Sequence, residues 1–271
     1  VIQSGEAKLM HYGVTDEEAW TVGLSCGGKI DVFIFPFFNK TNPKVWLSLK
    51  NSIHLNKAAS LVFDIDNKPH FDFIENEAKE SSSISESKYA LSRISLNQRK
   101  HVLSEHKDYF SLLISKKSQL IIIGAAHITV DLVSFAKQFG FETIVIDPRG
   151  FFTNNTQFQI QPDQLISDWP AEVLHNMELD QFTYAVTLSH DPKIDDQALE
   201  ILLNANVAYI GALGSKRTHA KRIARLETMG FDQTLINKIH APVGVSIQAK
   251  SPKEIALSVI AQIIAVKNQF L

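Results

Sequence analysis

The sequence of 271 residues contains one cysteine, Cys26, so no disulfide can form within the chain. A single thiol fits a reducing compartment, and we therefore expect a cytoplasmic protein. The ten histidines are scattered and show neither the H-x-x-E-H nor the H-E-x-x-H spacing of zinc enzymes. A closed zinc site would have to come from His and carboxylate ligands, and their spacing does not predict one.

The sequence also lacks long runs of one chemical type. Its longest apolar segments, 30–38 and 120–126, have the length of strands, whereas a membrane span needs about 20 apolar residues. No basic stretch is long enough to follow a nucleic-acid backbone, and the formal net charge is -2. We therefore expect a soluble protein that binds neither membranes nor nucleic acid.

The composition is that of an ordinary globular protein, with 45% apolar and 21% charged residues. The length allows two modest domains that each bury a core. The chain begins at Val1 instead of methionine, and no signal-peptide pattern follows. We interpret it as a chain whose natural start is missing.

Residues 1–115 are predicted to form a smaller, β-rich (α+β) N-terminal domain. Runs of β-branched and aromatic residues predict strands at 20–24, 30–38 and 60–65. The polar, serine-rich segment 75–86 is typical of an exposed loop. The pattern of residues 88–115 is ambiguous, and we assign this segment to the end of the same domain.

Residues 116–271 are predicted to form a Rossmann-like domain, in which a parallel sheet has helices on both faces. Short apolar strands alternate there with segments whose apolar residues recur at helical spacing. The predicted strands are 120–123, 143–146, 184–188 and 207–210, and the predicted helices are 128–139, 194–203, 216–229 and a last one from 252.

Two of these helices have well-marked ends. Gly140 stands where a glycine often ends a helix. Ser251-Pro252-Lys253-Glu254 combines an N-cap serine, a proline at the first helical position and a glutamate two residues further on. This combination is typical of a capping box.

The turn Gly124-Ala125-Ala126-His127 lies between a predicted strand and a predicted helix. Helix N-terminal N–H groups favour phosphate at such a turn, and Asp147, at the end of the next strand, stands where a ribose-binding acid belongs. However, Ala126 replaces the second glycine of the dinucleotide fingerprint and Thr129 the third. A tight turn without a dinucleotide therefore stays open as the alternative.

The segment Gly211-Ala212-Leu213-Gly214-Ser215-Lys216-Arg217-Thr218 also follows a strand and opens a helix. Two glycines, an expected cap at Ser215 and two cations predict an anion site at this helix start. Its spacing differs from that of a P-loop. A capped helix start with solvated cations is the alternative, and we expect the site to face the 124–127 turn.

Two further segments contain reactive side chains. Ser189-His190-Asp191 follows a predicted parallel strand, where His190 could bind a ligand or transfer a proton. Cys26 precedes Gly27 and Gly28, so a ligand could approach the backbone beside a soft sulfur donor. The alternatives are a loop satisfied by its own backbone and a small buried residue at a turn.

Taken together, these segments resemble the XdhC/CoxI family. Gly23-Leu24-Ser25-Cys26-Gly27-Gly28 resembles the family's GLxCGG segment, and residues 124–127 are similar to its GAGH turn. Further segments resemble the VDPR, THD, YIGxLGSRRT and IHAPIG blocks of the family, in the same order: Ile146-Asp147-Pro148-Arg149, Ser189-His190-Asp191, residues 209–218 and Ile239-His240-Ala241-Pro242-Val243-Gly244. The matches span roughly residues 20 to 260. Ser246 and Gln248 depart from the family, which has Asp and Gly there.

The resemblance implies an accessory protein without turnover. Such a protein binds molybdenum cofactor, as molybdopterin or its cytosine dinucleotide form, and delivers it to a molybdenum hydroxylase such as xanthine dehydrogenase. The implied partners include the cofactor sulfuration machinery, and a homodimer is expected. The implied site comprises Cys26, which would also contact Mo, and these residues: Gly27, Gly28, Gly124, His127, Asp147, Arg149, His190, Asp191, Gly211, Gly214, Ser215 and Arg217.

Two other functions stay open at this point. The Rossmann-like half alone would suit an NAD(P)-dependent oxidoreductase, although a fold does not determine a function. A pure interaction protein that has lost its ligand is the other alternative. Retention of NAD(P) would favour the oxidoreductase, and bound pterin with Mo would favour the accessory protein.

Overall fold

A computed structural model describes residues 1, 3–15, 27–36, 43–65, 70–75, 84–150 and 158–268. The chain divides into two compact units, Val1–Lys116 and Lys117–Leu271. No helix within the described ranges is both long enough and apolar enough to cross a membrane. The predicted strand at 20–24 and most of the predicted loop at 75–86 lie outside the described residues.

Unit 1 contains a four-stranded antiparallel sheet with the strand order β4-β3-β6-β5. Leu61 and Phe63 of the central strand pack against Phe71 on one face, while Val62 packs against Ile74 and Leu91 on the other. The alternation follows from the two-residue period of a strand. The strands are β3 (Ala59–Asp64), β4 (Phe71–Glu75), β5 (Val102–Leu103) and β6 (Tyr109–Ile114).

Among the described residues of unit 1, the other elements are two helices and an antiparallel ribbon. Phe33 and Phe35, at the end of the ribbon, pack against the cluster around Phe63. The ambiguous segment 88–115 proves to contain a helix and two strands. The elements are β1 (Lys8–Val14) paired with β2 (Gly28–Ile34), α2 (Pro43–His54) and α3 (Glu86–Gln98).

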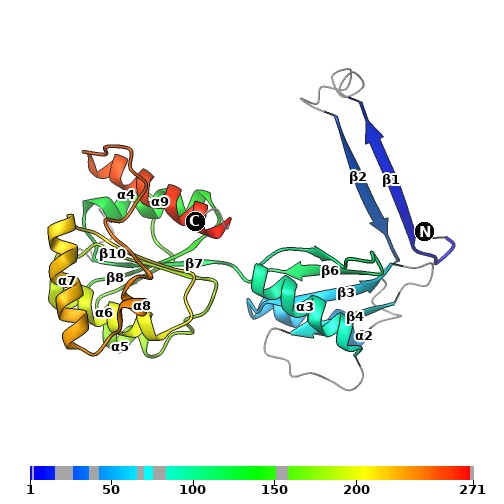
Figure 1. Cartoon of the computed structure of the whole chain (residues 1–271), viewed down its shortest axis with the longest axis horizontal. Helices are drawn as coiled ribbons and strands as arrows, with labels where there is room; N and C mark the ends of the chain where they lie inside the picture. Colours follow the sequence, from blue (N-terminus) through cyan, green and yellow to red (C-terminus); the bar gives the residue numbers. More distant parts are fainter. Residues whose placement is uncertain are drawn as a thin grey trace. The chain divides into compact units, whose positions relative to one another are not determined.

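Unit 2 contains a six-stranded parallel sheet with the order β12-β11-β10-β7-β8-β9 (Figure 1). The chain starts in the centre at β7, moves outward to β9, and returns to β10 on the other side of β7. The order therefore reverses between β7 and β10, which is the topological switch point of a doubly wound sheet. The strands are β7 (Gln119–Ile123), β8 (Glu142–Ile146), β9 (Gln164–Ile166), β10 (Thr183–Thr187), β11 (Tyr209–Ala212) and β12 (Ile239–His240).

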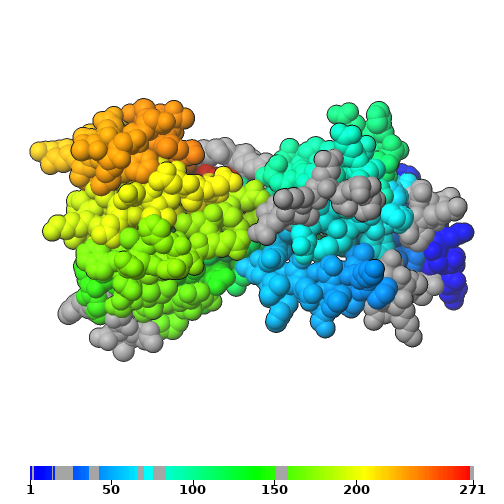
Figure 2. All heavy atoms as spheres, turned by 90° about the horizontal axis from the view of Figure 1, so that it is seen from below, coloured from blue at the N-terminus to red at the C-terminus, as the bar shows by residue number. Residues whose placement is uncertain are grey.

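Helices cover both faces of this sheet. Leu120 and Ile122 face the cluster that includes α4 (His127–Gln138) and α9 (Pro252–Lys267). Ile121 and Ile123 face the opposite cluster, and the segments that cover it run from yellow-green to orange in Figure 2. A strand buried on both faces needs a continuous apolar run, which β7 has. The helices of this second face are α5 (Pro170–Leu174), α6 (Pro192–Asn204), α7 (Lys216–Thr228) and α8 (Gln233–Ile236).

The structure confirms the predicted fold class, a Rossmann-like parallel sheet preceded by a smaller β-rich unit. Gly140 follows α4 with a φ of 77°, and Ser251 and Glu254 form the predicted capping box of α9. The short elements β9, α5, α8 and β12 were not predicted, because two to five residues are too few to show a period.

The predicted strand 207–210 is placed about two residues too early. The strand runs through Gly211 and Ala212, because Gly211 pairs with Val186 on one side and His240 on the other. A Cβ atom at Gly211 would lie 2.6 Å from Cγ2 of Val243. Gly211 is therefore a packing glycine inside a strand, and the predicted binding loop starts after it.

Candidate anion-binding site

The carboxylate of Asp147, at the end of β8, connects three loops at the carboxyl edge of the sheet. Its Oδ2 atom accepts the N–H of Ala125 at 2.8 Å, which holds the turn after β7. Arg149 donates to both carboxylate oxygens, from Nε to Oδ1 at 2.9 Å and from Nη2 to Oδ2 at 2.7 Å. Nη1 of Arg149 reaches the carbonyl of Ser189, in the loop after β10, at 3.1 Å.

The ionised form of Asp147 is stabilised by these contacts. Its side chain is buried, and burial alone would raise the pKa of the carboxyl group. The hydrogen bonds from Arg149 and Ala125 outweigh burial and hold the pKa below its ordinary value. Both oxygens of Asp147 accept N–H groups of the protein. The residue at the place of a ribose-binding acid therefore has a structural role in this chain.

Gly124 brings the turn after β7 into direct contact with the loop after β10. Its φ is 103°, a conformation that favours glycine. A Cβ atom there would lie 2.6 Å from both N and Cα of Ser189. The glycine of this turn therefore allows a close approach of two backbones.

The start of α7 is built as the sequence predicted. Ser215 is the N-cap, and its Oγ accepts the N–H of Thr218 at 3.2 Å. Beyond the cap, Arg217, Lys221 and Arg225 follow one another at intervals of four residues. Side chains at this spacing lie on the same face of a helix. The first turns of α7 therefore present a row of cations on one side.

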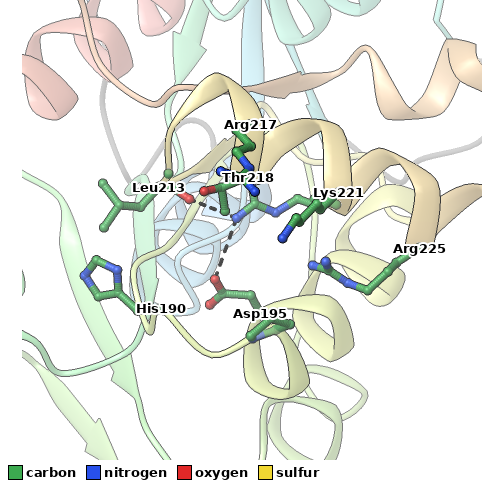
Figure 3. A pocket seen from close by; sticks show the side chains of 10 residues that line it. His190, Asp195, Leu213, Arg217, Thr218, Lys221 and Arg225 are labelled. Carbon is green, nitrogen blue, oxygen red and sulfur yellow. Dashed lines mark hydrogen bonds and ion pairs between the residues drawn. The ribbon is translucent and has the colours of Figure 1, made fainter.

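These cations line a cavity of about 390 Å³ between α7 and the loop after β10. Figure 3 shows Lys221 and Arg225 pointing from α7 towards Asp195, with His190 at the other side of the cavity. The volume is within the range of about 300–1,000 Å³ that is usual for small-molecule sites. The lining consists of His190, Pro192, Asp195, Leu213, Gly214, Arg217, Thr218, Lys221, Arg222 and Arg225.

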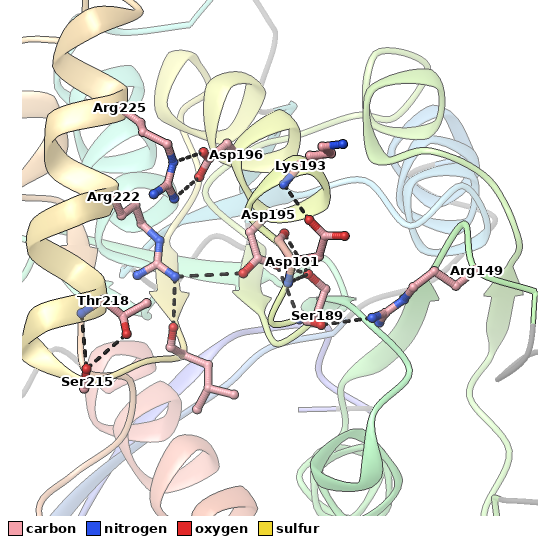
Figure 4. A network of polar contacts seen from close by, with 11 residues as sticks. Arg149, Ser189, Asp191, Lys193, Asp195, Asp196, Ser215, Thr218, Arg222 and Arg225 are labelled. Carbon is pink, nitrogen blue, oxygen red and sulfur yellow. Dashed lines mark hydrogen bonds and ion pairs between the residues drawn. The ribbon is translucent and has the colours of Figure 1, made fainter.

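Arg222 is the most deeply buried cation of this lining, with 2% of its surface exposed. Its Nη2 atom donates to the carbonyl of Leu213 at 2.9 Å, and the nearest carboxylate oxygen, on Asp195, is 3.9 Å away (Figure 4). Nε and Nη1 have no hydrogen-bond partner within the described part of the chain. A buried donor without a partner costs about 1–3 kcal/mol. An acceptor at Nε and Nη1 would therefore stabilise the guanidinium group.

The acids beside the cavity are already engaged. Asp195 accepts the hydroxyl of Ser189 at 2.6 Å, and burial raises the pKa of its carboxyl group. Asp196 accepts from Nη2 of Arg225 at 2.9 Å. Arg217 and Lys221 have no such partner among the described residues, so an anion entering the cavity would meet uncompensated positive charge.

The structure brings some of the predicted residues together and leaves others apart. His190, Gly214 and Arg217 line the cavity, with Ser215 as the helix cap beside it. The expectation that the site faces the 124–127 turn finds no support, because no residue of that turn contributes to the lining. The remaining predicted residues of unit 2 lie elsewhere at the carboxyl edge: His127 is exposed at the start of α4, and Asp191 caps α6 by accepting the N–H of Lys193.

Sequence reasoning missed Asp195, Lys221, Arg222 and Arg225. The signal for Lys221 and Arg225 was present, because they follow Arg217 at i+4 and i+8 on a predicted helix. The burial of Arg222 had no signal in the sequence.

In unit 1, Cys26 lies outside the described residues. Gly28 opens β2 and is exposed, and a Cβ atom added to it would meet nothing within 4 Å. Across the described ranges, no group of three or more His, Cys, Asp and Glu side chains could hold a metal ion.

The sequence of unit 2 matches a described protein family. A model of the XdhC Rossmann domain matches residues 120–263, which is more than half of the chain. The chain is 27% identical over 254 residues to a protein of Bacillus subtilis named as a probable xanthine dehydrogenase subunit, covering 94% of this chain and 74% of that protein. It is also 34% identical over 90 residues to "Molybdenum cofactor insertion chaperone PaoD" of Escherichia coli, covering 33% and 28% of the two chains.

A similar fold is known from a crystal structure described as a xanthine dehydrogenase from Bacillus halodurans. The TM-score is 0.70 with 27% identity, and the match covers 98% of this chain and 77% of the other. The likeness therefore includes both units and not only the Rossmann domain.

The Gly124 contact predicts a strong effect of a small substitution. We expect Gly124→Ala to lower the free energy of unfolding by about 3 kcal/mol or more, because strained backbone and a backbone clash add. Gly140→Ala is the matched control, since Gly140 also has a positive φ but open space around it. It should cost about 1 kcal/mol. Equal losses for the two variants in urea unfolding would contradict the close approach.

The Asp147 contacts predict a pH-dependent effect of Arg149→Met. Because the folded-state pKa of Asp147 is lowered, its stabilisation is present above about pH 4 and is lost as pH falls through the folded-state value. Without Arg149 this pKa rises. The variant should lose about 1–3 kcal/mol at pH 7, less than for a fully buried pair because Arg149 is 36% exposed. The loss should be smaller at pH 3, which is below the ordinary pKa of an aspartate.

The control is Lys137→Met, which removes a partly exposed ion pair with Asp163. It should cost less than about 1 kcal/mol at pH 7. If urea unfolding gives Arg149→Met the same loss at both pH values, Arg149 contributes by packing and not through the charge of Asp147.

Proposed function

The chain belongs to the XdhC family, and on this basis we propose that it is an accessory protein that binds molybdenum cofactor and delivers it to a molybdenum hydroxylase such as xanthine dehydrogenase. The names of two relatives support the two halves of this proposal. One is named as a probable xanthine dehydrogenase subunit, and the other is called a molybdenum cofactor insertion chaperone.

The structural observation that supports the proposal is the cationic cavity beside α7. Molybdopterin ends in a phosphate group, and its cytosine dinucleotide form contains a diphosphate. Phosphate is bound well by arginine, lysine and helix N-termini, which the cavity combines in Arg217, Lys221, Arg222 and the start of α7. A phosphate oxygen is also a suitable acceptor for the N–H groups of Arg222 that lack one.

In unit 1 we propose that Cys26 holds the molybdenum end of the cofactor. A thiolate is a soft donor suited to molybdenum and sulfur chemistry. Gly27 and Gly28 follow it, and the absence of side chains lets a bulky pterin approach the backbone. Of the residues predicted for cofactor binding in unit 2, we propose that His190, Gly214, Ser215 and Arg217 contact the cofactor at the cavity. The others lie outside the lining, and we propose that they shape the carboxyl edge around it: Gly124, His127, Asp147, Arg149, Asp191 and Gly211.

The role of these residues is to hold the cargo and release it, so no catalytic residue is proposed. Asp147 and Arg149 act by fixing the loops at the carboxyl edge, since their charged groups engage each other and Ala125. The alternative, an NAD(P)-dependent oxidoreductase, would use Asp147 on a ribose, and the oxygens of that carboxylate already accept protein N–H groups. We further propose a cytoplasmic homodimer that also meets the cofactor sulfuration machinery.

The proposal predicts that Cys26→Ser retains cofactor poorly. Serine has nearly the same size but is not a soft donor, so the molybdenum content after co-expression with cofactor biosynthesis should fall roughly tenfold or more. Metal analysis and the pterin absorbance measure this. Ser25→Ala is the control and should retain cofactor as the parent does.

Client binding and thermal melting of Cys26→Ser should both match the parent. Undiminished molybdenum in Cys26→Ser would contradict the ligand role of the thiol. Absence of pterin and molybdenum from the parent itself, with NAD(P) bound instead, would contradict the proposed function as a whole.

A further inference from the structure

We propose that the cavity beside α7 binds the phosphate or diphosphate end of the cargo, with Arg222 as the buried anchor and Arg217 and Lys221 as the outer cations. The choice of cargo rests on the proposed function. The anion site itself rests on the contacts of the cavity. Lys221 and Arg222 are not among the cofactor-binding residues that the sequence predicts.

The first argument is the state of the guanidinium group of Arg222. Arginine stays charged in proteins and offers five N–H donors, and here only Nη2 has an acceptor within hydrogen-bond distance among the described residues. Asp195 lies at 3.9 Å, and its Oδ1 atom accepts from the Ser189 hydroxyl and more weakly from the Ser189 N–H. An anion in the cavity would supply both the missing acceptors and the missing negative charge.

The second argument is the arrangement of the outer cations. Arg217 and Lys221 are separated by four residues, or about 6 Å along α7, so both can reach one ligand. Arg225 is one turn further on, and Asp196 already engages it. The uncompensated charge is thus concentrated at the N-terminal half of α7, where the helix dipole also favours an anion.

The third argument is that the mouth of the cavity is fixed by local geometry. Gly214 has a φ of 137°, and a Cβ atom there would lie 2.9 Å from Cγ2 of Thr218. Only a residue without a side chain lets the loop fold this tightly onto the first turn of α7. The same loop places the carbonyl of Leu213 on Nη2 of Arg222. The guanidinium group is therefore oriented before any ligand arrives, which lowers the ordering cost of binding.

The test is thermal melting of the purified full chain with inorganic phosphate, pyrophosphate or cytidine monophosphate, each against sodium chloride of equal ionic strength. The parent should melt at a higher temperature with a phosphate ligand than with chloride, because a ligand that binds only the folded state stabilises it. A larger effect of pyrophosphate than of phosphate would indicate the diphosphate of the dinucleotide form, and equal effects the single phosphate of molybdopterin.

The variants separate anion binding from structure. Arg217→Gln and Lys221→Gln should each weaken the apparent affinity about 10- to 100-fold, as expected when a charge-assisted contact is lost. Lys238→Gln is the control, because Lys238 is exposed in the same unit and lies outside the lining. It should bind phosphate as the parent does.

Arg222→Met removes the buried charge but keeps much of the volume. Without ligand it should melt at or above the parent's temperature, since the unpartnered cation is gone, and phosphate should no longer raise that temperature. A large drop in the melting temperature of Arg222→Met would overturn the proposal if either of two results accompanies it. Phosphate fails to raise the melting temperature of the parent, or it raises the melting temperatures of Arg217→Gln and Lys221→Gln as much as that of the parent. Arg222 would then be a structural residue.

The two proposals can fail separately. A parent that retains pterin and molybdenum after co-expression but shows no phosphate effect would refute this anion site and leave the accessory function standing. A parent that binds phosphate through Arg217 and Lys221 but never retains cofactor would refute the accessory function and leave the anion site standing.

Discussion

The carboxyl edge of the parallel sheet depends on one buried carboxylate. Asp147 fixes the turn after β7 through the N–H of Ala125, and through Arg149 it reaches the loop after β10. Gly124 then lets the two loops touch at the backbone. The turn after β7, the loop after β8 and the loop after β10 are thus held together, although they are far apart in sequence. The loop between β10 and α6 lies across the cavity from the start of α7. The candidate cavity lies between those last two segments.

The cavity contains a local departure from ordinary protein chemistry. Buried donors almost always have an acceptor, yet two nitrogen atoms of Arg222 have none among the described residues. Such a group costs folding free energy, and places where a sequence violates the usual rules are often functional. Here the departure coincides with two further cations and a helix start. Under the proposed function, such a site would be complete only when the phosphorylated cofactor is bound.

Much of the fold could be predicted from local patterns. The alternation of apolar strands with amphipathic helices indicated the parallel sheet, and Gly140 and Ser251 marked helix ends through their own backbone chemistry. The anion site was predicted at the start of α7, because Gly214, Ser215 and Arg217 are informative types at a helix start. The details that local patterns did not predict depend on tertiary contacts. Gly211 packs inside a strand against Val243, and the carboxylate of Asp147 engages Arg149 and the N–H of Ala125. Nothing in the sequence distinguishes buried Arg222 from exposed Arg217.

Transfer of molybdenum cofactor from this chain to another enzyme can be measured by mixing the cofactor-loaded chain with the apo-form of a purified molybdenum hydroxylase. The two proteins are then separated, and molybdenum and hydroxylase activity are measured in each. We expect molybdenum to leave the chain, to appear in the hydroxylase in matching amount, and to bring activity that the chain alone does not have. Molybdenum that stays with the chain while the hydroxylase remains inactive would contradict the proposed transfer.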